Sequence, residues 1–126
     1  MSYQTKLVMC NMLRLMNLKD EQALTKAMNN ETEATSKITD LARDYRDAKK
    51  NINAEYEYDD VEREQKIEEI EDQYKLDLAE LNEWQTEIDN EKVEKQTVIA
   101  KREDMIDMYE EEMPEEIKKD HTYGYN

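Results

Sequence analysis

The stretch LTKAMNNETEATSKITDLARDYRDAKKNI, residues 24–52, decides the fold, because its apolar side chains repeat with the spacing of a coiled coil. Nine positions follow alternating steps of three and four residues, and eight of them carry an apolar or aromatic side chain. The nine are Leu24, Ala27, Glu31, Ala34, Ile38, Leu41, Tyr45, Ala48 and Ile52. We therefore predict that residues 19–57 form a first coiled-coil arm, with these side chains in the seam where two helices meet.

A second long pattern of the same kind follows at residues 58–113, which we predict to be the second coiled-coil arm. Nine of its thirteen seam positions are apolar or aromatic. The thirteen are Ile67, Ile70, Tyr74, Asp77, Leu81, Trp84, Ile88, Glu91, Lys95, Val98, Arg102, Met105 and Tyr109. Three of the four polar exceptions, Glu91, Lys95 and Arg102, lie after residue 90, which is where the pattern of this arm weakens.

An alternative set of apolar residues, Val93, Ile99 and Ile106, lies close to those exceptions. Such a set predicts a seam that shifts along the helix face, as an insertion of four residues in a heptad pattern produces. Lys95 and Arg102 then mark either this shift, or a polar channel, or a feature that fixes the pairing register of the helices. The sequence leaves these interpretations open.

Between the two arms, residues 54–59 have the weakest helical pattern in the middle of the chain. Asp59 is followed three residues later by Glu62, which resembles a capping box at the start of a helix. We therefore predict a tight turn here and an antiparallel helical hairpin. The alternative is one uninterrupted helix from about residue 19 to residue 112, which would be about 140 Å long at 1.5 Å per residue.

Residues 1–18 are predicted to form a separate apolar helix, starting after Ser2 as its N-cap and ending near residue 17. One broad face of this helix is apolar and is wider than the seam of a two-helix coiled coil requires. It consists of Val8, Met9, Met12, Leu13, Leu15 and Met16. We expect this face to be an assembly interface. The helix either covers the longer second arm of its own chain or pairs with residues 95–112 of another copy.

Composition independently points to an all-α protein that carries a strong negative charge. The chain has 126 residues, one Gly and one Pro, which are too few for the turns of a multi-stranded sheet. Its formal net charge is −15, which argues against nucleic-acid binding. Residues 1–19 contain three cations and no acid, so residues 20–126 carry −18. This asymmetry favours head-to-tail contact between copies, or an acidic body that keeps an apolar end soluble.

Catalytic and ligand-binding motifs are not found, so we predict that the chain is not an enzyme and that it binds no cofactor or metal. One Gly excludes the glycine-rich phosphate loops, and one Cys with one His cannot build a zinc site. Cys10 is interpreted as a small packed side chain rather than a reactive thiol. Tyr74 and Trp84 are interpreted as core residues rather than a ligand site, and the acidic run at residues 110–116 as a solvated face.

The last residues, 114–126, are predicted to form a polar tail after Pro114 ends the second arm. Tyr123 and Tyr125 in this tail are candidate anchors on a neighbouring molecule, against the alternative of a frayed end. The apolar run at residues 7–18 is too short to cross a bilayer and lacks a cleavage site after it, so we predict neither a transmembrane segment nor a secretory signal peptide.

An apolar N-terminal helix followed by a charged coiled-coil hairpin resembles, in layout, the needle and filament subunits of type III secretion systems and the helical core of flagellin. The resemblance implies a subunit whose terminal helices pack around a filament axis and which is exported without processing. We therefore expect a structural subunit that self-assembles as a helical filament or another homo-oligomer, located outside the cell or at its surface. The alternatives are a cytoplasmic coiled-coil adaptor or secretion chaperone, and a virion-associated helical structural protein.

Overall fold

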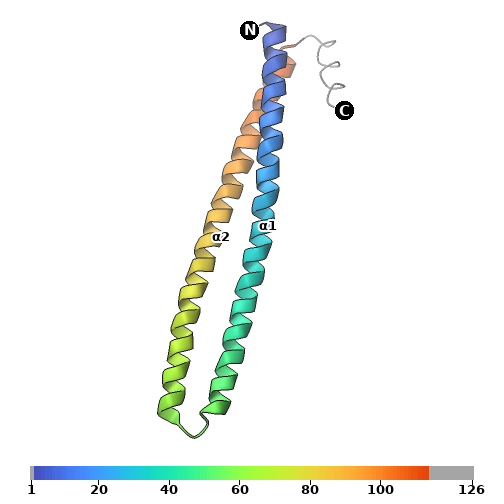
Figure 1. Ribbon diagram of the computed structural model, residues 1–126. Helices are drawn as coiled ribbons and strands as arrows, with labels where there is room; N and C mark the ends of the chain where they lie inside the picture. The colour runs from blue at the N-terminus through green and yellow to red at the C-terminus, as the bar shows by residue number, and fades with distance from the viewer. Residues whose placement is uncertain (1, 114–126) are drawn as a thin grey trace. The chain divides into compact units, whose positions relative to one another are not determined.

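The computed structural model describes residues 2–113, and within this range the chain forms two long helices and no strand. Helix α1 spans Tyr3–Glu55 and helix α2 spans Asp60–Glu111. The two helices run in opposite directions and pack against each other (Figure 1). The predicted all-α helical hairpin is confirmed, and the alternative of one uninterrupted helix is wrong.

Helix α1 continues without a break past residue 18, which corrects the prediction of a separate N-terminal helix. It begins as expected, because the hydroxyl of Ser2 accepts a hydrogen bond from the backbone N–H of Thr5 at 3.2 Å. The only Gly and the only Pro of the chain are Gly124 and Pro114. No helix-breaking residue therefore stands near residue 18, and the helix propagates into the first arm.

The connection between the helices, residues 56–59, lies inside the predicted turn. The carboxylate of Asp59 accepts a hydrogen bond from the backbone N–H of Glu62 at 3.1 Å, which caps the start of α2. The backbone N–H of Asp59 donates to the carbonyl oxygen of Tyr56 at 3.2 Å, so only one half of the predicted capping box is present. The turn thus closes with backbone and side-chain hydrogen bonds instead of a glycine.

The hairpin divides into two compact units, each made of one segment from either helix. Unit 1 consists, in its described part, of residues 2–26 of the α1 side and 91–113 of the α2 side. Unit 2 consists of residues 27–90 and contains the turn. The predicted boundary between the arms near residue 57 lies in the connection between α1 and α2, inside unit 2, and the one near residue 18 lies within α1.

Unit 2 packs along the predicted seam. Ala27, Ala34 and Ile88 are buried, and Trp84 packs against them. Closer to the connection between the helices, the rings of Tyr45 and Tyr74 stack with their centroids 4.6 Å apart. The remaining predicted seam positions of this unit are half-buried: Glu31, Ile38, Leu41, Ala48, Ile52, Ile67, Ile70, Asp77 and Leu81. Side chains without bulk at Ala27 and Ala34 let the two helices approach closely in this unit.

Candidate functional site

Unit 1 carries large apolar side chains both in its packed interior and on its surface, and the interior comes first. Cys10 of α1 is buried among Ile106, Tyr109 and Met113, the first two from α2 and the third just after its end. Leu7, Met9 and Leu13 pack against this cluster. The long second arm is therefore covered by the N-terminal part of its own chain, through the uninterrupted continuation of α1.

The seam on α1 keeps one register through both units. Counting back from Leu24, the same steps of three and four residues reach Asp20, Asn17, Leu13 and Cys10. All five side chains are buried or half-buried. Because α1 is continuous, the spacing of residues 24–52 also predicts which side of residues 10–20 faces α2.

The seam on α2 shifts after Ile88, as the alternative set of apolar residues indicated. Ile99 and Ile106 are buried, whereas Met105 is 37% exposed and Glu91 is exposed. Val98, Lys95 and Arg102 are half-buried. The prediction of seam positions at Met105 and Glu91 is therefore corrected by a shift of one residue, which is the signature of a four-residue insertion in the heptad pattern. Val93 does not join the shifted seam, because it is 61% exposed.

Polar side chains cross the interface of unit 1 around Asp20. The carboxylate of Asp20 forms ion pairs with Arg102 and with Lys95, whose Nζ lies 3.4 Å away. The hydrogen bond from Arg102 is the main reason why the pKa of Asp20 is lowered from its ordinary value. The side-chain amide of Asn17, which is 6% exposed, donates to the carbonyl oxygen of Ile99 at 3.3 Å. Lys95 and Arg102 thus lie in the interface as partners of an acid on the other helix.

Two further ion pairs tie the beginning of α1 to the end of α2. Lys6 contacts Glu112 at 2.7 Å, and Arg14 pairs with Glu110. The hydrogen bond from Lys6 lowers the pKa of Glu112. Both cations are at most about a quarter exposed, so they are held within unit 1 and are turned away from solvent. The mildly basic character of the N-terminal segment is therefore largely neutralised by acids of the same chain.

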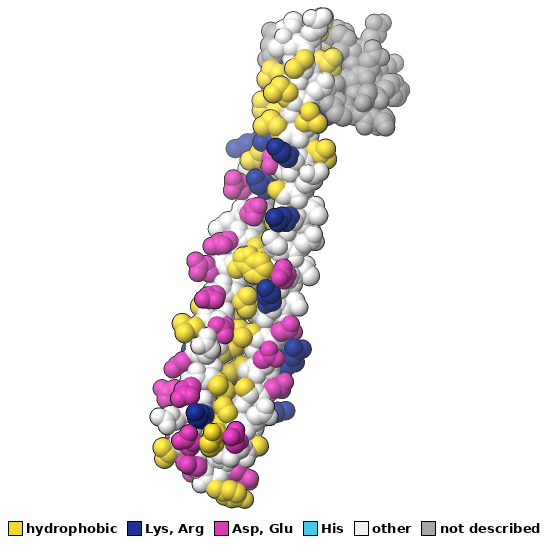
Figure 2. Space-filling model, viewed as in Figure 1, with side chains coloured by type: hydrophobic (Ala, Val, Ile, Leu, Met, Phe, Trp, Pro, Cys, Tyr) yellow, Lys and Arg dark blue, Asp and Glu magenta, His cyan; other side chains and the backbone are white. Residues whose placement is uncertain are grey.

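A band of exposed apolar side chains remains on the other side of α1. We call it the apolar stripe, and it consists of Val8, Met12, Leu15, Met16 and Leu18, which are 44–63% exposed. At 3.6 residues per turn, Val8, Met12 and Leu15 lie on the side of α1 opposite the one that packs on α2. Hydrophobic side chains gather at the surface over this part of the chain (Figure 2).

The structure therefore divides the broad apolar face that the sequence suggested as an assembly interface. Met9 and Leu13 turn toward the buried cluster around Cys10, while Val8, Met12, Leu15 and Met16 stay exposed. Asn17 is not part of the predicted apolar face, yet it is buried in the seam. The physical reason is that the α1 register continues from residue 24, and this register directs Asn17 and Asp20 toward partners on α2.

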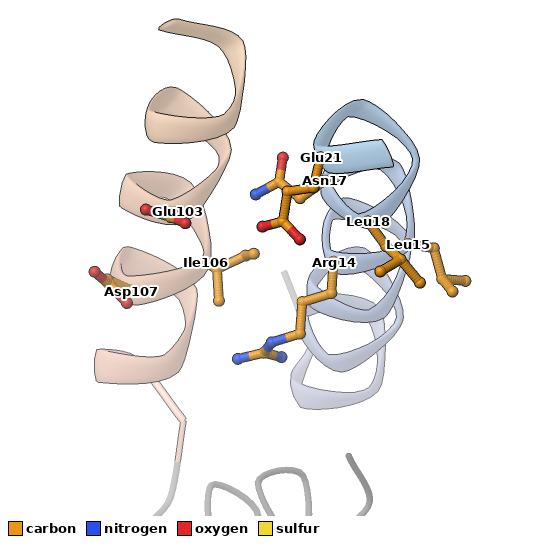
Figure 3. A pocket seen from close by; sticks show the side chains of 8 residues that line it. All are labelled: Arg14, Leu15, Asn17, Leu18, Glu21, Glu103, Ile106 and Asp107. Carbon is orange, nitrogen blue, oxygen red and sulfur yellow. The ribbon is translucent and has the colours of Figure 1, made fainter. Parts of the chain in front are cut away.

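A groove lies beside the stripe, between residues 14–21 of α1 and residues 103–107 of α2. Its lining combines the apolar Leu15, Leu18 and Ile106 with charged and polar side chains. In Figure 3, Arg14 and Ile106 point into the space between the helices, whereas Leu15 points away from α2. The groove is open to solvent along one side of the stripe, so a partner on the stripe would also reach the groove.

Cys10 lies apart from any reactive surface. Its side chain is fully buried, and this burial raises the pKa of the thiol. Among residues 2–113, no cluster of His, Cys, Asp and Glu is arranged to hold a metal ion. Neither described helix combines the length and the apolar character needed to cross a membrane.

Asn17 and Asp20 are the residues of this site that sequence reasoning missed. The signal was present, since both continue the spacing of the first arm toward the N-terminus. This spacing was overlooked because the packed side of the N-terminal segment was chosen by its hydrophobicity, and the most apolar side of residues 1–18 is not the side that packs. The predicted tail anchors Tyr123 and Tyr125 lie outside the described residues, as does Pro114.

Comparison of the chain with protein-family models, with curated proteins and with solved structures gave no match. The function must therefore be inferred from the residues and their arrangement.

Proposed function

We propose that the chain is a structural subunit that self-associates through the apolar stripe on α1. One observation carries the proposal: five large apolar side chains are exposed within residues 8–18 of α1, and three of them, Val8, Met12 and Leu15, face away from the hairpin partner. Contiguous apolar surface of this kind on a soluble helix is typical of an interaction site. The resemblance of the sequence to needle, filament and flagellin subunits, an apolar N-terminal segment before a charged hairpin, supports a structural role and implies export without processing.

The stripe is large enough to matter energetically. Fully burying a Leu, Val or Met side chain contributes about 1.5–3 kcal/mol. Association costs about 4–15 kcal/mol in lost translational and rotational freedom. Covering five side chains that are about half exposed offsets a substantial part of this cost, and the groove beside Leu15 and Leu18 offers further apolar contact.

The first test is the particle mass of the full chain, measured by sedimentation velocity and negative-stain electron microscopy at several concentrations. Wild type is expected to form dimers or larger particles. Leu15→Asp is expected to remain monomeric, because a buried unpaired carboxylate opposes burial of the stripe. Leu76→Asp is the matched control: Leu76 is 64% exposed and lies on α2 in unit 2, so this variant should associate like wild type.

Deletion of residues 1–18 is an unsuitable test, because it removes Cys10 and Leu13 from the packed cluster of unit 1 as well as the stripe. Circular dichroism should show equal helicity for wild type, Leu15→Asp and Leu76→Asp. A wild type that stays monomeric at every concentration would contradict self-assembly and would favour an adaptor whose stripe receives a helix of another protein.

A further inference from the structure

We infer that the occupant of the apolar stripe is the same stripe of a second copy, so that unit 1 pairs with unit 1. This inference rests on the proposed self-association and specifies its geometry. The competing arrangement is head-to-tail contact, in which the N-terminal segment of one copy binds the acidic body of the next. The charges and contacts of the described residues distinguish the two.

Two of the N-terminal cations that could attract the acidic part of another copy already form ion pairs within their own chain. Lys6 is paired with Glu112 and its side chain is only 14% exposed, and Arg14 is paired with Glu110. Within residues 2–19, this leaves Lys19 as the exposed cation. The sequence alone suggested that these cations attract acids of another copy. In the structure, Lys6 and Arg14 are instead paired with acids of unit 1 of their own chain.

Most of the negative charge of the chain belongs to unit 2, whereas the stripe belongs to unit 1. Unit 2 contains 20 Asp and Glu against 8 Lys and Arg, a formal charge of −12. The described part of unit 1 contains 10 acids against 8 cations, a formal charge of −2. Like charges repel, so pairing that places unit 2 against unit 2 is opposed, whereas two copies of unit 1 approach each other almost without net repulsion.

The surface of the stripe suits pairing with itself. The first acid in the chain is Asp20, and Asp20 is turned toward Arg102 and Lys95 of α2. Two stripes can therefore meet without placing a carboxylate of residues 2–19 in the contact, and the nearest carboxylates, Glu21, Glu103 and Asp107, line the groove at its edge. Val8, Met12 and Leu15 of the stripe lie opposite the face that binds α2, so both α1 helices would be central and both α2 helices peripheral. A contact made by one patch on both copies closes as a two-fold dimer.

The test uses cysteine variants of the full chain and a short bis-maleimide crosslinker at neutral pH. Leu15→Cys and Met12→Cys place a thiol on the stripe, and Leu76→Cys places one on unit 2 at a site of equal exposure to Leu15. Wild type, whose only thiol is the buried Cys10, measures background. A Cys10→Ala version of each variant repeats the experiment if that background is high.

Stripe-to-stripe pairing predicts crosslinked dimers of Leu15→Cys or Met12→Cys at least five-fold above background, and none above background for Leu76→Cys. When Leu15→Cys is mixed with a Leu76→Cys chain of different mass, mixed dimers should stay at background. Abundant mixed dimers would overturn the inference in favour of head-to-tail contact while leaving self-association intact. Association by sedimentation without crosslinks at either stripe position would overturn it too. A monomeric wild type would remove the inference together with the proposed function.

Discussion

At the scale of single residues, the polar contacts of unit 1 are as informative as its apolar core. Asp20, Asn17, Arg102 and Lys95 join the two helices at positions where a coiled coil normally places apolar side chains. Polar seam residues of this kind satisfy each other only in one alignment of the helices. We therefore interpret them as residues that fix the register of α1 against α2 in unit 1.

Replacing Asp20 by Asn tests this interpretation through pH. Because the folded-state pKa of Asp20 is lowered, its stabilising contribution is fully present above the ordinary value of 3.8 and is lost as the pH falls through the lower folded value. We expect Asp20→Asn to melt below wild type at pH 7, with a difference that shrinks below about pH 3.8. Circular-dichroism melts measure both. The exposed Asp72→Asn serves as control, and a wild-type melting point for Asp20→Asn at pH 7 would contradict the assignment.

Ala34 provides the corresponding test of the apolar seam in unit 2. Its side chain is fully buried, so a larger residue has no space without displacing α2. We expect Ala34→Leu to lower the free energy of unfolding by about 1–3 kcal/mol, measured by urea denaturation. Ala79→Leu, at an exposed position of α2 in the same unit, should change it by less than about 0.5 kcal/mol. Equal urea midpoints for Ala34→Leu and wild type would show that the helices are farther apart here.

At the scale of elements, the two helices and the turn followed from the sequence because their causes are local. Heptad spacing, strong helix formers and the Asp59 cap act within a few residues of where they stand. The end of the N-terminal helix near residue 18 was predicted wrongly, because a change in side-chain character does not break a helix where no Gly or Pro stands nearby. Hydrophobicity alone did not identify the side of the N-terminal segment that packs on α2. The seam spacing of residues 24–52 continues into this segment, and it directs the polar Asn17 and Asp20 toward α2.

The cap of α2 is the element-scale feature that mutation tests most directly. Asp59→Ala removes the acceptor that satisfies the backbone N–H of Glu62 at 3.1 Å. We expect a loss of about 0.5–2 kcal/mol in the free energy of unfolding, measured by urea denaturation. Asp72→Ala, in the interior of α2, is the control for removing an exposed carboxylate. A larger loss from Asp72→Ala than from Asp59→Ala would contradict the capping role.

At the scale of the whole molecule, charge and the apolar stripe act against each other. A net charge of −15 opposes association of copies, and apolar contact favours it. Salt weakens only the first, since the screening length falls from about 30 Å at 0.01 M to about 10 Å at 0.1 M. The balance between these two forces should therefore depend on ionic strength.

Raising the salt concentration from about 0.01 M to about 0.5 M at pH 7 is accordingly expected to shift wild type toward larger particles. Sedimentation velocity measures the change, and the concentration of chain at which half is associated should fall several-fold. Leu15→Asp should stay monomeric across the series, because screening does not restore the apolar contact. Particles that shrink as salt is added would instead indicate that attraction between opposite charges holds the copies together.

The buried thiol of Cys10 makes local opening of unit 1 measurable as a rate of chemical labelling. A water-soluble thiol reagent reaches it only when residues 2–13 separate from residues 106–113, because the side chain is closed off by Ile106, Tyr109 and Met113. The labelling rate of an unmodified sample therefore counts openings of unit 1, in the way that amide exchange counts openings of a backbone hydrogen bond. Any partner that docks on the stripe and holds α1 in place would lower the labelling rate of Cys10.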